Sequence, residues 1–363
     1  MKFRCERDVL VEAIGIASRA VSGRSSLPGL SGIRASLHGD QLTLTGSDLD
    51  LTISTTFTVS GESDGVSVIP ARLASDIVRA VQPGAVSFAA EDESLSIRAG
   101  RSEFSIRLIS GDEFPQLSGL DVEPVSLPSA QLAEALKQVV LAASTDDSRP
   151  ILTGVLLAAE EGGIRLVATD SYRLAMRDVS EASVLAEGQS VLIPSRALGE
   201  LNRVLAQDDT VSLRFGQNEA SFEVGSVTLV TRLIEGDFPN YRGLIPDSHP
   251  NQLVVNREEL LDALRRVKLL ARETTPIRIE MSEEGMELVA VTQDVGTARE
   301  SLESTYTGSN LVVAFNPQYL LEGAEVAPSE EIALATIDEL KPALVRAVGV
   351  EEFLYLLMPV RVS

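Results

Sequence analysis

Two pairs of acidic residues have spacings that could support metal chemistry. Asp48 and Asp50 alternate in GSDLDL, and Asp146 and Asp147 are adjacent in STDDSR. Side chains two positions apart on a strand point to the same face, so Asp48 and Asp50 could bind Mg²⁺ through their carboxylate oxygens. Aspartate is also common at strand ends and in turns, where it accepts backbone hydrogen bonds. The pattern leaves two hypotheses open, a magnesium-dependent enzyme and ordinary turn positions.

Other reactive side chains are scarce. The chain has one cysteine, Cys5, and two histidines, His38 and His249, which fall on expected loops. A single cysteine permits no internal disulfide, and so few soft ligands argue against a zinc or iron–sulfur site. The sequence contains neither a glycine-rich phosphate loop nor a nucleophile elbow. It therefore predicts no catalytic residue, no resident metal and no cofactor, with Cys5 as a small buried side chain.

Size and charge set the broad class of the protein. The 363 residues are enough for two or three domains, and 44% of them are apolar, too many for a disordered chain. No apolar run approaches the roughly 18 residues of a membrane helix, and the charged start MKFRCERD does not resemble a signal peptide, which predicts a cytoplasmic protein. The net charge of −22 argues against nucleic acid as a partner unless basic residues gather on one surface.

The sequence repeats itself. Apolar residues at helical spacing recur about every 120 residues, and a second set of helices begins at proline at a similar interval. The first set is Leu10, Ala13, Ile14 and Ala17, then Leu132, Leu136, Val139 and Val140, then Leu260, Leu261, Leu264 and Val267; the prolines are Pro70, Pro194 and Pro317. Apolar residues at every second position between these helices, such as Leu42 and Leu44, are typical of strands with one solvent-exposed face. We therefore predict an α+β fold of three tandem domains, residues 1–121, 122–250 and 251–363, each a duplicated half of one helix plus strands.

The charges are unevenly distributed along this repeat. Basic and acidic residues nearly cancel within the six predicted helices, so the strands and loops carry almost the whole negative charge. Solvated helix faces would explain this distribution, and so would a molecule that turns its helices towards an anionic partner and its acidic surface away from it.

Several long phrases, in order along the whole chain, resemble the bacterial DNA polymerase III beta subunits, the beta sliding clamps. These phrases are the opening MKF, AVSGRSSLPGLSGI, LTLTGSDLDLTI, SRPILTGVLL, LVATDSYRLA, RLIEGDFPNYRGLIP and the terminal YLLMPVRVS. The resemblance implies three DNA-clamp domains per subunit and a head-to-tail homodimer that closes a ring, with helices inside and sheets outside. It implies a non-catalytic subunit of the replicative polymerase holoenzyme, located in the cytoplasm at the nucleoid, that encircles duplex DNA independently of sequence.

The resemblance also implies two sets of surface residues. The DNA-facing positions are Arg24, Arg72, Arg149, Arg196, Arg203 and Lys137, and the apolar centre of the dimer interface is Phe104 and Ile106 against Leu269 and Leu270. Weakly basic helices would allow sliding, because a strongly cationic hole would hold the phosphates too tightly. Solvated surface arginines are the alternative interpretation of the first set.

A third implied site is a pocket between domains 2 and 3 that captures short peptides of the polymerase catalytic subunit, the clamp loader, other polymerases and repair proteins. Its residues by motif are Leu152, Thr169, Asp170, Arg173, Leu174, Pro239, Leu244, Asn316, Tyr319, Met358, Pro359 and Arg361. The leucines could instead be interdomain core. Ser171 and Tyr172 stand where many members have Gly-His, and Gly243 stands where arginine is common, so the rim departs from the family pattern.

Three functions therefore stand side by side: a DNA sliding clamp, a scaffold that binds only proteins, and a magnesium enzyme using Asp48 and Asp50. Retention on DNA separates the first two, and a divalent-metal titration tests the third.

Overall fold

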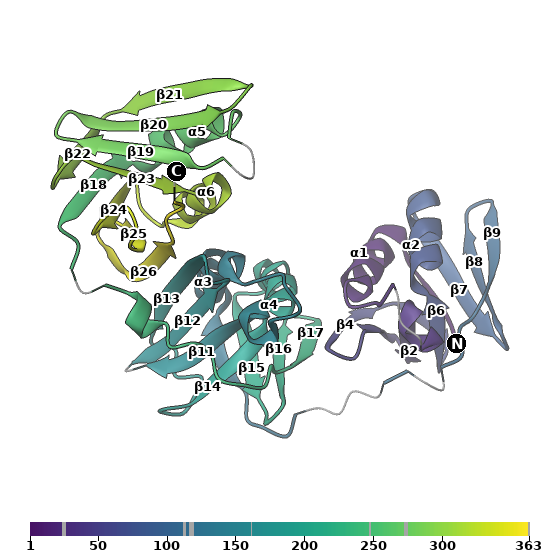
Figure 1. Cartoon of the computed structure of the whole chain (residues 1–363). Helices are drawn as coiled ribbons and strands as arrows, with labels where there is room; N and C mark the ends of the chain where they lie inside the picture. Colours follow the sequence, from purple (N-terminus) through teal and green to yellow (C-terminus); the bar gives the residue numbers. More distant parts are fainter. Residues whose placement is uncertain are drawn as a thin grey trace. The chain divides into compact units, whose positions relative to one another are not determined.

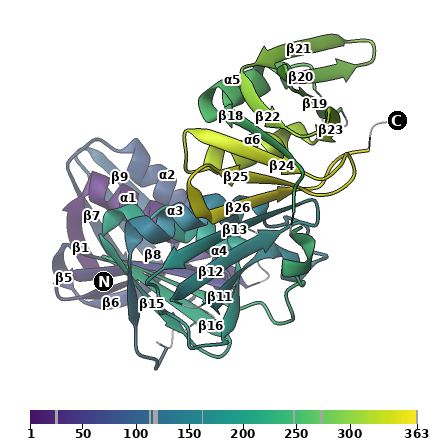
Figure 2. The ribbon, with the colours of Figure 1, turned by 90° about the vertical axis from the view of Figure 1, so that its left-hand side faces the viewer.

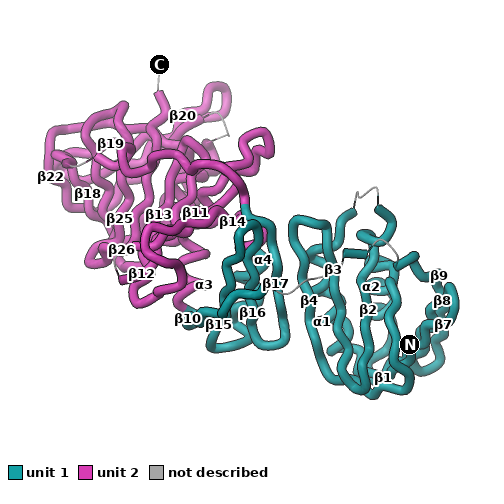
Figure 3. Tube along the Cα trace, turned by 90° about the horizontal axis from the view of Figure 1, so that it is seen from below, with its two compact units in different colours: residues 1–130, 199–233 teal, residues 131–198, 234–363 magenta. Residues whose placement is uncertain are grey.

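The computed structural model describes residues 1–23, 27–111, 114–115, 120–160, 162–246, 248–271 and 275–361. The chain divides into two compact units, distinguished by colour in Figure 3. Unit 1 contains Met1–Ala130 and Gly199–Leu233, and unit 2 contains Gln131–Leu198 and Ile234–Ser363. No helix within the described ranges is long and apolar enough to cross a membrane.

Unit 1 contains two antiparallel sheets. The five-stranded sheet has the order β5 (Ser60–Ser63), β1 (Lys2–Glu6), β7 (Ala85–Glu91), β8 (Ser94–Ala99) and β9 (Ser102–Arg107). The eight-stranded sheet has the order β10 (Val125–Pro128), β15 (Thr210–Phe215), β16 (Glu219–Val224), β17 (Val227–Arg232), β4 (Leu51–Thr58), β3 (Gln41–Ser47), β2 (Gly32–His38) and β6 (Gly65–Pro70). The β17–β4 pair, which aligns Leu229 with Ile53, joins strands far apart in the sequence into one sheet.

Two helices pack side by side in unit 1, α1 (Arg7–Ser18) and α2 (Ala71–Ala80) (Figure 1). The predicted apolar stripe of α1 is buried, and Ile14 and Ala17 are fully enclosed. Both helices share one core with the inner faces of the strands, including Phe3 stacked on Phe88 with ring centroids 5.2 Å apart. This arrangement confirms the helix-plus-strands pattern expected for the first two predicted halves.

Unit 2 also contains two antiparallel sheets. The nine-stranded sheet has the order β14 (Ser190–Pro194), β11 (Gly154–Glu160), β12 (Gly163–Thr169), β13 (Arg173–Ser180), β26 (Val350–Leu357), β25 (Ala343–Ala347), β24 (Glu331–Thr336), β18 (Asn251–Asn256) and β22 (Ser304–Thr307). The four-stranded sheet has the order β21 (Gly296–Leu302), β20 (Gly285–Thr292), β19 (Ile277–Ser282) and β23 (Leu311–Phe315). Figure 2 shows β13 next to β26, the pair that connects the two halves of the larger sheet.

The helices of unit 2 begin close to their predicted starts. They are α5 (Arg257–Val267) and α6 (Pro317–Val326), while α3 (Ser129–Val139) and α4 (Ser195–Asn202) each cross the division between the units. Five short 3-10 helices complete the described elements: η1 (Pro28–Ser31), η2 (Val140–Ala142), η3 (Pro150–Thr153), η4 (Leu205–Gln207) and η5 (Arg242–Leu244). Pro317 is the first residue of α6, as predicted, whereas Pro70 and Pro194 each precede a helix by one residue.

The α+β class and the sixfold repetition are thus confirmed, with one α-helix in each predicted half. The reason lies in local patterning. A stripe of period 3.6 can be buried only by a helix, and an alternating run only by a strand, so each half encodes its elements independently of the others.

Candidate functional site

The candidate site of unit 2 lies where β13 and β26 meet. Arg173 pairs with Leu357 and Leu174 with Leu356, and Leu357 pairs on its other side with Ala343 of β25. This register brings three chain segments to one end of the sheet: the turn before β13, the segment after β26 and the segment before β25. Residues of the expected peptide pocket that are more than 180 positions apart in the sequence thus become neighbours.

The turn between β12 and β13 is fixed by its own polar side chains. Oδ1 of Asp170 accepts hydrogen bonds from the backbone N–H groups of Tyr172, at 2.9 Å, and Arg173, at 3.0 Å. The hydroxyl of Thr169 donates to the carbonyl of Arg173 at 2.7 Å. Thr169 and Asp170 are both buried, so they stabilise the turn rather than form its exposed surface. Tyr172 is 61% exposed at the tip of this turn.

Arg173 is the most densely bonded residue of the site, although only 9% of its surface is exposed. Its Nε donates to Oδ2 of Asp170 at 3.0 Å, and its Nη1 donates to Glu322 and, at 3.3 Å, to the hydroxyl of Tyr355. The guanidinium carbon lies 4.2 Å from the ring centroid of Tyr319, a cation–π contact. Arg173 therefore ties β13 to α6 and β26 through one buried charge cluster.

Burial and charge act in opposite directions within this cluster. Burial opposes the charge on Arg173, but Tyr355 and Glu322 more than compensate and raise the pKa of the guanidinium. Burial also raises the pKa of the Tyr355 hydroxyl above its ordinary range, so this group stays protonated. The hydroxyl donates to the carbonyl of Tyr319 at 3.0 Å. The cluster holds a fixed arginine cation at any physiological pH.

Helix α6 presents the other side of the site. The side chain of Asn316 caps the helix by accepting hydrogen bonds from the backbone N–H groups of Gln318 and Tyr319. Gly323 lies against the ring of Tyr355, and a β-carbon at this position would come within 2.4 Å of the ring. The cap and the glycine thus set the position at which Tyr319 and Glu322 meet Arg173.

The segment after β26 lies between the turn and strand β23. The N–H of Met358 donates to the carbonyl of Tyr172 at 2.8 Å, and the N–H of Val360 donates to the carbonyl of Ala314 at 2.8 Å. Met358 remains 38% exposed. Pro359 is partly exposed between these two contacts, and Arg361 is exposed at the end of the described chain.

The apolar residues of the site divide into a floor and a rim. Leu174 is fully buried with Tyr241, Leu344 and Leu356, so the structure places it in the core, and Leu152 is partly buried. Pro239 and Leu244 are exposed on the segment that covers this core. Five large apolar side chains are exposed on these segments: Tyr172, Leu244, Leu340, Met358 and Val360. Exposed apolar side chains on neighbouring segments are candidates for contacts with a partner.

Sequence reasoning missed Leu340, Tyr355 and the partnership of Arg173 with Glu322. Leu340 precedes β25 by three residues, so only the pairing of β25 with β26 reveals its place. The spacing of Tyr319 and Glu322 after a capping asparagine was a usable signal, because it places both side chains on one side of a helix.

The residues predicted to face DNA have diverse surroundings. Arg24 lies outside the described residues. Arg72 is exposed on α2, Lys137 on the last turn of α3 and Arg196 on α4. Arg203 is paired with Glu200 at 3.0 Å.

Arg149 differs from the others because it lies beside the candidate site of unit 2. Its Nη1 donates to the hydroxyl of Ser171 at 3.3 Å, and its Nε pairs with Asp146 at 2.9 Å. Hydrogen bonds from Ser148 and Arg149 lower the pKa of Asp146. Arg149 is thus positioned by the turn that carries Tyr172.

The residues predicted for the dimer interface lie on one edge strand, β9, and in the segment that follows α5. Phe104 and Ile106 are partly exposed on β9, the edge strand of the five-stranded sheet. Leu269 follows α5 and is 84% exposed, whereas Leu270 is partly buried and its carbonyl accepts a hydrogen bond from Thr292. Arg266 pairs with Glu300 of the edge strand β21, which lowers the pKa of that carboxyl.

The position of Asp48 and Asp50, considered above as a magnesium site, is explained by the turn that they form. Oδ1 of Asp48 accepts hydrogen bonds from the backbone N–H groups of Asp50, at 3.2 Å, and Leu51, at 2.8 Å, so it organises a turn. Within the described part of the chain, no group of three His, Cys, Asp or Glu side chains could hold a metal ion. Cys5 is buried, which raises the pKa of its thiol, and burial lowers the pKa of His249.

Ser171 has a backbone conformation that most residues avoid, with φ at 82°. A branched side chain is strained in this region, whereas glycine is not. We expect Ser171→Val to lower the free energy of unfolding by about 2 kcal/mol and Ser171→Gly to change it by less than about 1 kcal/mol. Denaturant titration of the three proteins measures both effects. Equal stability of the valine and glycine variants would contradict the strained geometry.

The whole chain is similar to known sliding clamps. Its residues 1–118, 126–240 and 242–361 match the N-terminal, central and C-terminal domain models of the DNA polymerase III beta subunit. It is 32% identical to the beta sliding clamp of Synechococcus elongatus, covering 99% of each chain, and 31% identical to that of Bacillus subtilis, covering 99% of this chain and 100% of the relative.

Solved structures agree with the sequence comparisons. The DNA polymerase sliding clamp of Bacillus subtilis has a TM-score of 0.93 at 30% identity, and the sliding clamp of Bartonella birtlesii bound to griselimycin has a TM-score of 0.94 at 30% identity. Both comparisons cover 100% of each chain. With all three domain models matched in order along its length, the chain belongs to the DNA polymerase III beta subunit family, the bacterial beta sliding clamps.

Proposed function

We propose that this chain is the DNA sliding clamp of a bacterial replicative polymerase, a processivity factor that encircles duplex DNA and tethers other proteins to it. The observation that carries this function is the match over the full chain to clamps in sequence and fold. The sixfold repetition supports it, because equivalent helix-plus-strands halves are suited to building a ring. The chain acts without catalysis of its own, as a subunit of the polymerase holoenzyme in the cytoplasm, at the nucleoid.

The working form is a homodimer closed head to tail. Residues 1–121, 122–250 and 251–363 form its three domains, and two copies supply six. The exposed edges β9 and β21 support this closure, since unpaired strand edges are groups that a second chain can complete. Phe104, Ile106 and Leu269 supply apolar surface beside these edges.

Duplex DNA occupies the ring without sequence recognition. The helices, which line the proposed ring, have little net charge, whereas the chain as a whole has a net charge of −22. The outer surface of the ring therefore repels DNA phosphates, and the inner surface attracts them only weakly. Arg72, Lys137 and Arg196 supply a few phosphate contacts, and Arg24 and Arg203 are further candidates. Weak contacts bridged by water allow the ring to slide.

The candidate site of unit 2 captures short peptides of the polymerase, the clamp loader and repair proteins. The exposed rim of Tyr172, Leu244, Leu340 and Met358 supports apolar capture, and the buried Arg173 cluster keeps the walls of the site in place. Such a combination of apolar rim and fixed polar groups is typical of peptide grooves. Arg149 at the same turn adds a cation for an acidic peptide side chain.

A topological experiment tests the clamp function. The protein is loaded onto circular DNA by its clamp loader, and the DNA is then linearised. We expect a complex that persists on the circle and is lost from the linear form. Binding that is equal on both forms, or no retention on the circle, would reject the clamp and favour the scaffold that binds only proteins.

Replacing Met358 by Ala is expected to weaken a clamp-binding peptide of the replicative polymerase about 10-fold or more, because an apolar anchor at the rim is lost. Tyr319→Ala should act in the same direction. Fluorescence anisotropy of the labelled peptide gives the affinity. The matched control is Val348→Ala, an equally exposed side chain, at 41%, at the opposite end of the β25–β26 hairpin. Equal peptide affinity in the Met358 and Val348 variants would contradict the assignment of Met358 to the peptide pocket.

A further inference from the structure

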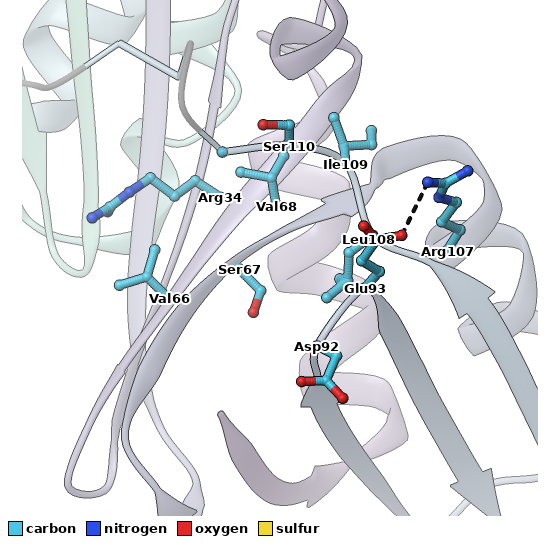
Figure 4. Close-up of a pocket in the computed structure, with 11 residues that line it drawn as sticks. Arg34, Val66, Ser67, Val68, Asp92, Glu93, Arg107, Leu108, Ile109 and Ser110 are labelled. Carbon is cyan, nitrogen blue, oxygen red and sulfur yellow. Dashed lines mark hydrogen bonds and ion pairs between the residues drawn. The ribbon is translucent and has the colours of Figure 1, made fainter.

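Unit 1 contains a pocket of about 410 Å³ between β6 and the chain that follows β9 (Figure 4). Both strands are sheet edges, β6 of the eight-stranded sheet and β9 of the five-stranded sheet. Beyond β9 the chain is joined to β6 by a backbone hydrogen bond, in which the N–H of Ile109 donates to the carbonyl of Val68 at 3.0 Å. The two sheets thus leave an open corner beside the edge that the proposed dimer uses.

The pocket has an apolar wall and one arginine that is not ion-paired. Val66 is 55% exposed, and Leu108 and Ile109 are partly exposed near it. Arg34 lies on the Val66 side in Figure 4 and forms no ion pair with any described residue. On the other side, Arg107 is neutralised by Glu93 at 3.0 Å. Asp92, next to Glu93, makes that side unsuitable for an anion, so an acidic group would favour the Arg34 side.

One segment of the chain has the complementary character. The turn between β20 and β21 carries the exposed residues Asp294 and Val295 directly before the edge strand β21. Asp294 is exposed, has φ at 61° and forms no ion pair with any described residue. Val295 is 46% exposed.

Strand direction brings this turn to the pocket in the proposed dimer. All strand pairs named here are antiparallel, and antiparallel addition of β21 to β9 brings the end of β21 that begins at Gly296 to the end of β9 that finishes at Arg107. Residues that precede Gly296 must then run past the end of β9, alongside Leu108 and Ile109. That course leads across the pocket.

We propose that this pocket is a socket for the β20–β21 turn of a second copy of the chain, with Val295 against Val66 and Asp294 facing Arg34. The socket rests on the proposed dimeric ring. It would fix the register of the two sheet edges, because backbone pairing alone does not select among registers.

A charge exchange tests the socket in the full-length protein. We expect Arg34→Glu and Asp294→Arg each to weaken dimerisation about 5-fold, because each leaves two like charges facing one another. The double variant should return to within about 2-fold of the wild type. Analytical ultracentrifugation measures the dissociation constants. The control is Arg4→Glu, which changes an exposed arginine on β1, the second strand of the five-stranded sheet.

A covalent test does not depend on the strength of the ion pair. In a Cys5→Ser background, the Val66→Cys, Val295→Cys double variant should form a dimer with a short bismaleimide, and neither single variant should. Both side chains are exposed in the subunit, so the substitutions leave the core intact.

The outcomes separate the socket from the ring. A wild type that remains monomeric at every concentration would reject the dimeric ring and the socket together. If the wild type is a dimer but the effects of the two charge substitutions simply add and no cross-link forms, the socket is rejected. That result would not contradict the dimeric ring. Charge rescue in the double variant, together with the cross-link, would establish the socket.

Discussion

Replacing Leu269 by Asp is expected to leave the protein monomeric at concentrations where the wild type is a dimer. Leu269 is 84% exposed in the single subunit and directly follows α5, a helix that packs against the edge strand β21. In the proposed dimer a second copy of the chain covers this side chain. Burying a carboxylate there without a counter-ion costs several kcal/mol, so the dissociation constant should rise about 100-fold or more.

Leu269 is a better test than Leu270, which already packs within its own subunit and has its carbonyl bonded by Thr292. The control is Val312→Asp on β23, the opposite edge of the same four-stranded sheet. Val312 is also exposed, so the control adds the same charge to the surface of unit 2, on the sheet edge that the proposed interface does not use. Sedimentation velocity over a dilution series measures both variants. A Leu269 variant that dimerises like the control would place the interface elsewhere.

The elements of the fold could be predicted because their signals are local. Leu10, Ile14 and Ala17 recur at the period of a helix, and each of the six helices begins within a residue or two of the position that such patterns indicate. Ile277 and Ile279 alternate as a half-buried strand does, and both lie in β19. These patterns depend only on which side of an element faces the core.

The pairing of distant strands could not be predicted in the same way. Leu229 lies opposite Ile53, and Leu174 opposite Leu356, yet no local pattern distinguishes these partners from other apolar strands. Their association depends on which sheet edges remain unpaired after each half has folded, a property of the whole chain. The exposed rim formed by Tyr172, Leu340 and Met358 follows from such a pairing, which is why the sequence pointed to only part of it.

Local patterns were also insufficient for side chains whose role depends on a partner. Arg149 was predicted to face DNA, and its partners Asp146 and Ser171, which place it beside the candidate site of unit 2, could not be predicted from the sequence. The unusual backbone of Ser171 was visible in the sequence only as a departure from the family's glycine. Both residues show that a site residue is defined by the segments which the fold brings to it.

Arg173 is the site of the second large expected effect, because its removal would leave the buried carboxylate of Asp170 and the partly buried carboxylate of Glu322 without their cation. We expect Arg173→Met to lower the free energy of unfolding by about 3 kcal/mol or more, a typical cost of breaking a buried ion pair. Methionine keeps much of the side-chain volume, so the loss would report charge and hydrogen bonding rather than a cavity. Denaturant titration monitored by circular dichroism measures the loss. Arg203→Met is the control, since Arg203 is largely exposed in its pair with Glu200 and should cost less than about 1 kcal/mol.

A double-mutant cycle with Glu322→Gln separates the arginine's contribution to folding from its role in joining β13 to α6. If the pair stabilises this junction, the second substitution should cost much less in the Arg173→Met background than in the wild type. The same variants should bind the polymerase peptide more weakly, because Tyr319 loses the guanidinium that fixes its ring. If the stability losses of the two substitutions add and the peptide affinity is unchanged, the cluster stabilises β13 without joining it to α6. Coupled losses in both measurements would make Arg173 the residue that holds the two walls of the peptide site at a fixed distance.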